Sequence, residues 1–292
     1  MAAQQDRYIP GVPCWIDTTP PDLDASLAFY GELFGWDFVD VAPEGAPGPY
    51  HVARLGGKSV AAVRPQQPGQ SRPATWNTYV WVEDAEATTA RVRDAGGTVI
   101  VEPRDTGEAG RMAVFADPEG APFCVWEPKA HRGAEVVNEP GSLNFNVLHT
   151  RDMEAAQAFY GAVFGWELIH GAFWALPAYG DFLEQRTPGM RENMATMGAP
   201  ARFEEVVASV GPIPGDQLDV RPHWGVTFAV DDADAIAARA TELGGTVDVP
   251  PLDAPWTRMT VITDPQGASF VASKFVPENK DLEPDGSSAT AA

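Results

Sequence analysis

Three side chains of this sequence stand where acid–base chemistry would be possible. Asp17 lies within the strand-like run Val12–Thr19, where the two-residue period of a strand puts it on the same face as Trp15. A carboxyl group beside aromatic rings could serve as a general acid or base. His149 and His223 each adjoin another strand-like run, and an imidazole exchanges protons near neutral pH. These three residues are the catalytic candidates.

The composition is typical of a soluble globular protein. The chain has 292 residues, of which 44% are hydrophobic and 10% aromatic, enough for two ordinary cores. A net charge of −21 repels polyphosphates and anionic lipids, so we expect neither a nucleic-acid nor a membrane partner. Two cysteines, no apolar leader at Met1 and no apolar run of about 18 residues predict a cytoplasmic protein. Cys14 and Cys124 fall on opposite strand faces, so we expect free thiols.

The elements that carry the candidate residues occur in repeated units. Ala28–Trp36 returns as Ala158–Trp166 with seven of nine positions identical, at an offset of 130 residues. Asp22 and Asp152 stand seven residues before the first Phe of each copy and can cap the helix that holds it. A Gly-Gly-Thr-Val run and an Asp-Pro-x-Gly turn also occur twice, with offsets of 148 and 147 residues. The sequence therefore predicts four β-α-β-β-β units.

We predict two domains from these repeats. The predicted segments are a flexible arm at 1–11, a first domain at 12–128, a linker at 129–141, a second domain at 142–276 and a disordered tail at 277–292. The stretch Gly171–Gly211 is longer and less regular than its counterpart in the first domain. Its Pro, Gly and Met residues indicate a loop that lies over something.

The repeated motifs resemble those of one superfamily. Phe-Tyr-Gly-x-x-Phe-Gly-Trp in the first and third units, with Gly-Gly-Thr-Val and Asp-Pro-x-Gly-x-x-Phe in the second and fourth, is similar to the glyoxalase/bleomycin-resistance/dioxygenase (vicinal oxygen chelate) superfamily. The two-domain form resembles actinobacterial glyoxalase-like proteins. The resemblance covers about residues 12–276 and implies an α+β fold. Each of two glyoxalase-like domains would be a curved mixed sheet, with helices on its convex face and a cleft on its concave face.

The resemblance also implies where a metal would bind. In metal-using members, ligands come from the first strand of each unit and the last strand of the second unit. The corresponding positions here are Trp15, Asn77, Phe145, Gly225, Cys124 and Val271. None is His, Glu or Asp, and a neutral amide with one thiolate is a poor donor set for a hard or borderline ion. We therefore expect no cofactor, and the alternative is a divalent metal held in a different register.

The same positions indicate what would line the clefts. The candidate ligand-binding residues are Trp15, Asn77, Tyr79, Trp81, Cys124, Trp126, Phe145 and Thr227. Three Trp and one Tyr around a few polar groups would suit a planar or extended apolar molecule, unless these aromatics pack against one another. In the second cleft, His149 and His223 share the ligand face, so we expect their rings to approach each other. Trp174 or Trp256 could reach in from neighbouring loops.

These features favour binding over catalysis. The favoured function is binding of a small aromatic or polyketide-like molecule in a metal-free, aromatic-lined cleft, for sequestration or natural-product metabolism. The alternative is an enzyme of the same superfamily, a lyase, isomerase or hydroxylase-like member that uses Asp17, His149 or His223 as acid or base. A scaffold with vestigial clefts is a third reading. We expect a small-molecule partner and either a monomer or a homodimer.

Overall fold

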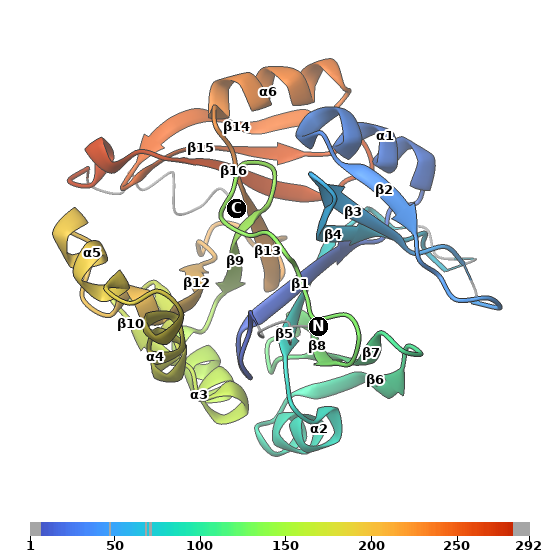
Figure 1. The fold of residues 1–292 in the computed structure, drawn as a ribbon, viewed down its shortest axis with the longest axis horizontal. Coiled ribbons are helices and arrows are strands. Elements are labelled where there is room, and N and C mark those ends of the chain that lie inside the picture. Colours follow the sequence, from blue (N-terminus) through green and yellow to red (C-terminus); the bar gives the residue numbers. More distant parts are fainter. Residues whose placement is uncertain (1–6, 47, 68, 70–71, 283–292) are drawn as a thin grey trace. The chain divides into compact units, whose positions relative to one another are not determined.

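The computed structural model describes residues 7–282 except 47, 68, 70 and 71. Within that part of the chain, the strands form two eight-stranded sheets, accompanied by six α-helices (Figure 1). Both sheets combine parallel and antiparallel strand pairs. The predicted α+β class with mixed sheets is therefore confirmed.

The two sheets have the same strand order, which confirms the duplication. The first sheet has the order β2 (Asp37–Asp40), β3 (His51–Leu55), β4 (Lys58–Val63), β1 (Pro13–Thr18), β5 (Trp76–Trp81), β8 (Pro122–Pro128), β7 (Gly110–Ala116) and β6 (Thr98–Asp105). The second sheet has the order β10 (Glu167–Ile169), β11 (Phe173–Ala175), β12 (Val206–Pro212), β9 (Leu143–Thr150), β13 (His223–Ala229), β16 (Ser269–Phe275), β15 (Thr257–Thr263) and β14 (Thr246–Ala254).

Four of the six α-helices begin where the sequence predicts. The helices are α1 (Leu23–Phe34), α2 (Ala85–Asp94), α3 (Met153–Phe164), α4 (Pro177–Arg186), α5 (Met190–Met197) and α6 (Ala233–Glu242), with short 3-10 helices η1 (Phe203–Glu205) and η2 (Pro277–Asn279). The four predicted helices are α1, α2, α3 and α6, whereas α4 and α5 were not predicted. Asp22, Asp84, Asp152 and Asp232 cap α1, α2, α3 and α6, and each side chain accepts a hydrogen bond from the backbone N–H three residues on. Helix α2 packs along β6–β8 and α6 along β14–β16.

The chain packs as two compact units, and each unit joins segments that are distant in the sequence. Unit 1 comprises Met1–Cys14, Tyr79–Arg132 and Asn146–Trp224, and unit 2 comprises Trp15–Thr78, Gly133–Phe145 and Gly225–Ala292. Unit 2 therefore combines the first and fourth repeats, whereas unit 1 combines the second and third. The boundaries 12–128 and 142–276 stay a prediction about the sequence repeats, and the compact units cut across them.

The doubled motif, Ala28–Trp36 and its copy Ala158–Trp166, holds the two repeats of each unit together. In unit 2, the Tyr30 hydroxyl donates a 2.8 Å hydrogen bond to Oδ2 of Asp264, in the Asp-Pro-x-Gly turn of the fourth repeat. In unit 1, the Tyr160 hydroxyl donates a 3.0 Å bond to Oδ2 of Asp117, in the turn of the second repeat. All four side chains are buried. The motif is thus a packing element that binds non-adjacent repeats.

Aromatic rings fill the core of each unit around that tyrosine. In unit 2, the ring of Tyr30 lies 5.3 to 6.2 Å, between centroids, from the rings of Phe34, Trp36, Trp76 and Phe270. In unit 1, the rings around Tyr160 are those of Phe164, Trp166, Trp174 and Trp224. Such contacts are favourable in edge-to-face and offset arrangements. The core position of Trp174, which is fully buried, corrects the expectation that it could reach into a cleft.

The stretch Gly171–Gly211 is more ordered than the loop that the sequence suggested. It contains β11, α4, α5, η1 and most of β12. Pro177 occupies the start of α4, where a missing N–H costs nothing, and left-handed glycines at 189 and 198 flank α5. The Pro and Gly residues therefore mark helix ends.

The two ends of the chain fall only partly within the described residues. Residues 1–6 of the predicted arm and 283–292 of the predicted tail lie outside them. In the described part of the arm, Tyr8 is buried, and the N–H of Gly11 donates a 2.9 Å hydrogen bond to the Trp81 carbonyl. In the described part of the tail, Pro277 opens η2.

Candidate functional site

The candidate site residues divide between the two units. Unit 2 contains Trp15, Asp17, Asn77, Phe145 and Thr227. Unit 1 contains Tyr79, Trp81, Cys124, Trp126, His149 and His223. The geometry of each set is therefore built within its own unit.

Asp17 is the centre of a buried hydrogen-bond network in unit 2. Its side chain is fully buried on β1. The Asn77 amide Nδ2 donates a 2.7 Å hydrogen bond to Oδ1 of Asp17, and Nε of Arg64 donates a 3.1 Å bond to Oδ2. Burying a carboxylate is costly unless it is paired and hydrogen-bonded, and both oxygens here meet that condition. The network therefore anchors Asp17 as a paired carboxylate.

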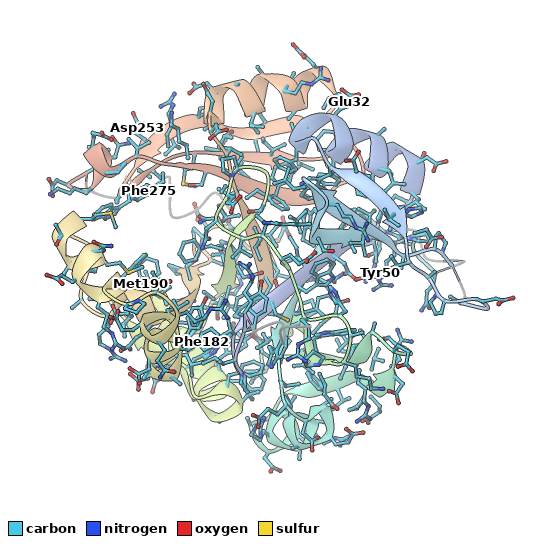
Figure 2. All side chains as sticks on the ribbon, viewed as in Figure 1. Glu32, Tyr50, Phe182, Met190, Asp253 and Phe275 are labelled. Atoms are coloured by element: carbon cyan, nitrogen blue, oxygen red, sulfur yellow. The ribbon has the colours of Figure 1, made fainter. Side chains whose placement is uncertain are left out.

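Tyr50 extends this network to the indole of Trp15. The Nε1–H of Trp15 donates a 2.9 Å hydrogen bond to the Tyr50 hydroxyl, which donates in turn to Oδ2 of Asp17 at 3.4 Å. This shared partner confirms that Trp15 and Asp17 lie on one strand face. Burial, followed by the nearby Asp17 charge, raises the pKa of Tyr50. Tyr50, labelled in Figure 2, lies immediately before β3.

Tyr50 and Arg64 are members of this network that were not predicted from the sequence. Each lies just outside a strand, Tyr50 before β3 and Arg64 after β4. The signal that could have found Arg64 is Asp17 itself, because a buried carboxylate requires a cation or several donors. Which arginine meets it depends on the parallel pairing of β1 with β4, where Thr18 lies opposite Val63.

The remaining unit 2 candidates offer one hydroxyl and one ring. Thr227 is buried on β13, opposite Val271 of the parallel strand β16. Phe145 is half-buried on β9. Neither residue supplies a charged or imidazole donor, so this part of unit 2 can provide a hydroxyl hydrogen bond and apolar contact.

The aromatic candidates of unit 1 stand in register on two parallel strands. Tyr79 of β5 lies opposite Cys124 of β8, and Trp81 lies opposite Trp126. The strand faces assigned by alternation are therefore confirmed, and all four side chains are buried. Neither Cys14 nor Cys124 forms a disulfide, as expected. Burial raises the pKa of the Cys14 thiol well above its usual range, which makes it unreactive.

Residues of the N-terminal arm and of the predicted linker pack on the two tryptophans. The ring of Tyr8 lies 6.1 Å from that of Trp81, and the Arg132 guanidinium lies 5.1 Å from the Trp81 centroid. The Nε1–H of Trp126 donates a 2.8 Å hydrogen bond to the carbonyl of His131. These partners belong to the arm and the linker, so the contacts do not test whether the candidate aromatics pack against one another. The arm was expected to be flexible, and these contacts were not predicted.

The structure brings His149 and His223 together in unit 1, which confirms their predicted approach. Their rings stack with centroids 4.7 Å apart and an angle of 17° between the planes. His149, at the end of β9, is 5% exposed, whereas His223, at the start of β13, is half-buried. The two strands thus present one imidazole inside the protein and one closer to its surface.

Hydrogen bonding distinguishes the two imidazoles. Nδ1 of His223 lies 2.8 Å from the Arg221 carbonyl, which can only accept, so Nδ1 carries the proton and donates. Nε2 of His149 is buried and has no hydrogen-bond partner among the residues that the structure describes. Burial, together with the neighbouring His223, lowers the pKa of His149 to about 3. His149 is therefore a neutral imidazole with unused hydrogen-bonding capacity.

The positions at which related proteins would hold a metal offer poor donors here. The Trp15 indole donates to Tyr50, and the Asn77 amide donates to Asp17. The stacked imidazoles also fit a shared ion poorly, because lone pairs in the planes of nearly parallel rings do not converge on one point. None of these residues supplies the carboxylate that two imidazoles would need.

A separate group of carboxylates could hold a cation at the start of α2. The carboxylate oxygens of Asp84, Glu86 and Glu127 come within 4.8 Å of one another. Each already has a protein partner: Asp84 caps α2, Glu127 accepts a 2.9 Å hydrogen bond from the Ala85 N–H, and Glu86 pairs with Arg111. These acids organise the first helical turn and lie outside the candidate cleft positions.

Comparison with known proteins places this geometry in a family. The profile of the Glyoxalase/Bleomycin resistance protein/Dioxygenase superfamily matches residues 15–125 and 142–271. DnrV of Streptomyces peucetius, an anthracycline biosynthesis protein, is 40% identical over 278 residues, covering 90% of this chain and 93% of DnrV. CFP32 of Mycobacterium tuberculosis, a proposed glyoxylase, is 38% identical over 283 residues, covering 94% of this chain and 99% of CFP32.

Solved structures show the same fold at low sequence identity. The Mn(II)-bound glyoxalase from Novosphingobium aromaticivorans superimposes with a TM-score of 0.58 at 17% identity, covering 94% of this chain and 84% of that protein. The 2,3-dioxygenase LapB from Pseudomonas sp. KL28 gives a TM-score of 0.56 at 14% identity, covering 95% and 98% of the two chains. Among the described residues, no helix is long and apolar enough to span a membrane. The chain belongs to the Glyoxalase/Bleomycin resistance protein/Dioxygenase superfamily.

Proposed function

We propose that this protein binds a small planar molecule of aromatic or polyketide-like type without a metal, and that His149 supplies a polar contact to it. The observation that carries the proposal is the buried Nε2 of His149, which lacks a hydrogen-bond partner among the described residues. Leaving such an atom unpaired costs about 1–3 kcal/mol, so its presence calls for an explanation. A hydroxyl or carbonyl group of a bound molecule would pair with it.

The electrostatics of His149 favour hydrogen bonding over proton transfer. An imidazole whose pKa is about 3 stays neutral at physiological pH and is a weak base. Asp17, a second of the three candidate bases, has Asn77 and Arg64 as hydrogen-bond donors, one on each oxygen. An acid–base enzyme would need a group that is free to exchange a proton near neutral pH. His149 lacks that property and the oxygens of Asp17 are occupied, which leaves His223 as the remaining candidate base. Binding is therefore the function that we favour, and catalysis by His223 is the alternative.

The donor chemistry supports metal-independent binding. The six positions that correspond to family ligands carry Trp, Asn, Phe, Gly, Cys and Val, and none provides an imidazole or a carboxylate. The ring of His223 is partly accessible and stacks on His149. A flat ligand could extend this stack, because aromatic and imidazole rings pack face to face with an offset. Recognition would then combine ring stacking with one buried hydrogen bond.

The names of two relatives narrow the class of molecule. DnrV of Streptomyces peucetius and DauV of Streptomyces sp. strain C5 are anthracycline biosynthesis proteins, each 40% identical to this chain over 278 residues. An anthracycline is a planar aromatic polyketide that carries hydroxyl and quinone oxygen atoms. We therefore place hydroxylated planar polyketides first among the ligands, with sequestration or a role in natural-product metabolism as the outcome of binding.

A substitution that keeps the ring but removes its nitrogen atoms tests this proposal. Alizarin, a planar dihydroxyanthraquinone, would be titrated into chelator-treated protein while tryptophan fluorescence is recorded. His149→Phe preserves ring stacking and approximate volume but cannot pair with a ligand oxygen. We expect its dissociation constant to rise about tenfold, the value of roughly one hydrogen bond.

The control is His51→Phe, which changes a half-buried histidine of unit 2 and should leave the affinity unchanged. Equal affinities of wild type and His149→Phe would remove His149 from the binding site. Saturable binding that weakens about tenfold in His149→Phe, and is unchanged in His51→Phe, would support it.

A further inference from the structure

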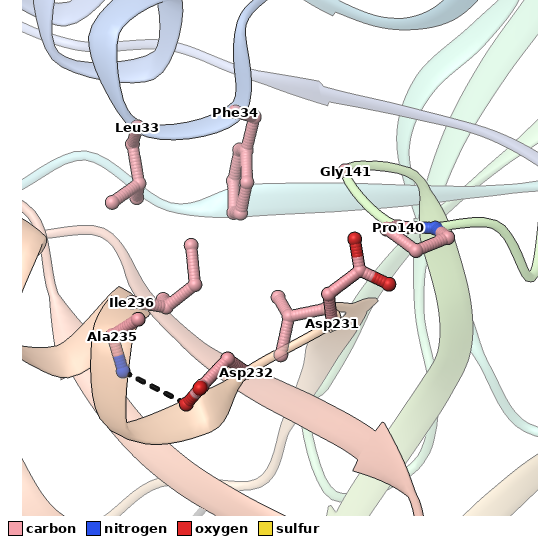
Figure 3. Close-up of a pocket in the computed structure, with 9 residues that line it drawn as sticks. Leu33, Phe34, Pro140, Gly141, Asp231, Asp232, Ala235 and Ile236 are labelled. Atoms are coloured by element: carbon pink, nitrogen blue, oxygen red, sulfur yellow. Dashed lines mark hydrogen bonds between the residues drawn. The ribbon is translucent and has the colours of Figure 1, made fainter.

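Unit 2 contains a pocket that the proposed function does not use. It lies between the end of α1 and the start of α6, and the loop at Pro140 closes one side (Figure 3). Leu33 and Phe34 of α1 face Ile236 of α6 across the pocket, and Val230 contributes a further apolar surface. We call this the α1/α6 pocket. Its walls would contact the apolar body of a small molecule.

The polar groups of the α1/α6 pocket are negative or hydrogen-bond acceptors. Asp231 is exposed and forms neither a hydrogen bond nor an ion pair within the described part of the chain. Asp232 accepts hydrogen bonds from the N–H groups of Asp234 and Ala235 as the cap of α6. The end of α1 adds partial negative charge, because the last carbonyls of a helix have no partner within the helix. The start of α6 contributes the opposite partial charge, which the Asp232 carboxylate offsets, so Asp231 and the α1 carbonyls favour a cation at this place.

The duplicated fold shows what fills the equivalent place in unit 1. The Leu33 carbonyl of α1 corresponds to the Val163 carbonyl of α3 by the 130-residue offset. There, Nε of Arg91 donates a 3.1 Å hydrogen bond to the Val163 carbonyl, and its NH2 group donates a 2.9 Å bond to the Thr88 hydroxyl. Unit 1 therefore supplies its own guanidinium to the end of α3.

Unit 2 directs the corresponding arginine elsewhere. Arg239 occupies the position of Arg91, 148 residues on, but it donates a 2.6 Å hydrogen bond to Glu32 and a 3.0 Å bond to Glu242. Glu32 has Ala162 as its counterpart in unit 1, so only unit 2 has this competing carboxylate. Among the described residues, no hydrogen bond reaches the Leu33 carbonyl. The α1/α6 pocket thus lacks a guanidinium like that of Arg91, which donates to the equivalent carbonyl in unit 1.

From this internal comparison, we infer that the α1/α6 pocket binds a small organic cation, with an amidinium, guanidinium or ammonium group attached to an apolar body. The cationic group takes the place that Arg91 occupies in unit 1, between the Leu33 carbonyl and the Asp231 carboxylate. The apolar body packs among Phe34, Val230 and Ile236. The net charge of −21 also favours the approach of cations.

Benzamidine and its neutral analogue benzamide provide a direct test on the full-length protein. Binding would be followed by ligand-observed NMR titration at low ionic strength. We expect saturable binding of benzamidine and much weaker binding of benzamide. Asp231→Asn should weaken benzamidine binding about fivefold, the effect of one exposed charge pair, and added salt should weaken it further. The matched control is Glu83→Gln, the counterpart of Asp231 in unit 1, which should leave benzamidine binding unchanged.

Two further variants separate the effect of filling the pocket from that of removing a charge. Glu32→Ala removes the carboxylate that competes for Arg239, so Arg239 should turn to the Leu33 carbonyl and displace benzamidine, although Ile236 stands where unit 1 has the Thr88 hydroxyl. Adding Arg239→Ala to this variant should restore binding, because the carbonyl is open again. Equal binding of benzamidine and benzamide, or no recovery in the double variant, would overturn the inference. His149→Phe should leave benzamidine binding intact, which keeps this test separate from that of the proposed function.

Discussion

The buried side chains of Asp17 and His149 compensate for lost solvation in different ways. The carboxylate of Asp17 accepts hydrogen bonds from Asn77 and Arg64, so the protein itself satisfies it. The imidazole of His149 stays neutral and keeps Nε2 without a partner among the described residues. A fold maintains an unsatisfied buried atom at the expense of stability. This contrast is why we assign Asp17 a structural role and propose a ligand contact for His149.

Because His149 stays neutral in the folded protein, the free energy of unfolding should depend on pH. The folded-state pKa of His149, about 3, lies below its ordinary value of 6.5. As pH falls below about 6.5, the unfolded chain binds a proton that the folded chain does not, so wild type loses stability. His149→Phe lacks this loss and should gain about 2 kcal/mol relative to wild type at pH 5. Urea unfolding at pH 5 and pH 8 measures the difference.

At pH 8, the variant should be at least as stable as wild type, because an apolar ring replaces an unsatisfied nitrogen. Stability curves that run parallel for the two proteins between pH 5 and pH 8 would contradict the assigned neutral state of His149.

At the scale of elements, the doubled motif is a clamp between repeats. Tyr160 in α3 reaches the Asp117 turn, and its hydroxyl also accepts a 2.9 Å hydrogen bond from Nε1 of Trp224. The motif Trp166 donates a 2.8 Å bond to the Gly11 carbonyl, just as Trp36 does to Gly141 in unit 2, at 2.7 Å. These residues recur because they connect elements, which explains a repeated motif without chemistry of its own.

Removal of one hydroxyl tests the clamp. Tyr160→Phe deprives Trp224 of its acceptor and Asp117 of its donor, and both groups are buried. We expect a loss of about 2 kcal/mol in the free energy of unfolding. Tyr30→Phe, the matched variant of unit 2, removes the donor to Asp264 and should also destabilise the protein. Unfolding midpoints in urea that stay at the wild-type value in both variants would show that the motif is not a clamp.

Local patterns predicted the strand faces and helix starts, whereas contacts between distant segments were not predictable. Alternation placed Tyr79 with Trp81, and the parallel register of β5 with β8 confirms the face. The partners Tyr50 and Arg64 of the Asp17 network depend on strand pairing, which no local signal specifies. The packing of Tyr8 on Trp81 likewise comes from a segment without a periodic pattern.

At the scale of the molecule, the sequence repeats and the compact units have different boundaries. The sequence repeats divide the chain near its middle, but each compact unit takes one repeat from either half. Duplication also explains how two related sites can differ. The copies differ at Glu32 against Ala162 and at Ile236 against Thr88, and Arg239 pairs with Glu32 whereas Arg91 reaches the helix end in the other unit. Repeats that share a fold can therefore differ in what they bind.

Whether metal ions change the ligand affinity is the sharpest test of metal-free binding. Alizarin would be titrated calorimetrically into protein that was treated with chelator and dialysed, and then into the same protein with equimolar Mn²⁺, Zn²⁺ or Ni²⁺, with metal–alizarin blanks subtracted. Because the family ligand positions carry no imidazole or carboxylate, the account predicts saturable binding in the metal-free protein, with a dissociation constant that the metals change by less than about twofold. Binding that appears only after one of the metals is added would contradict it.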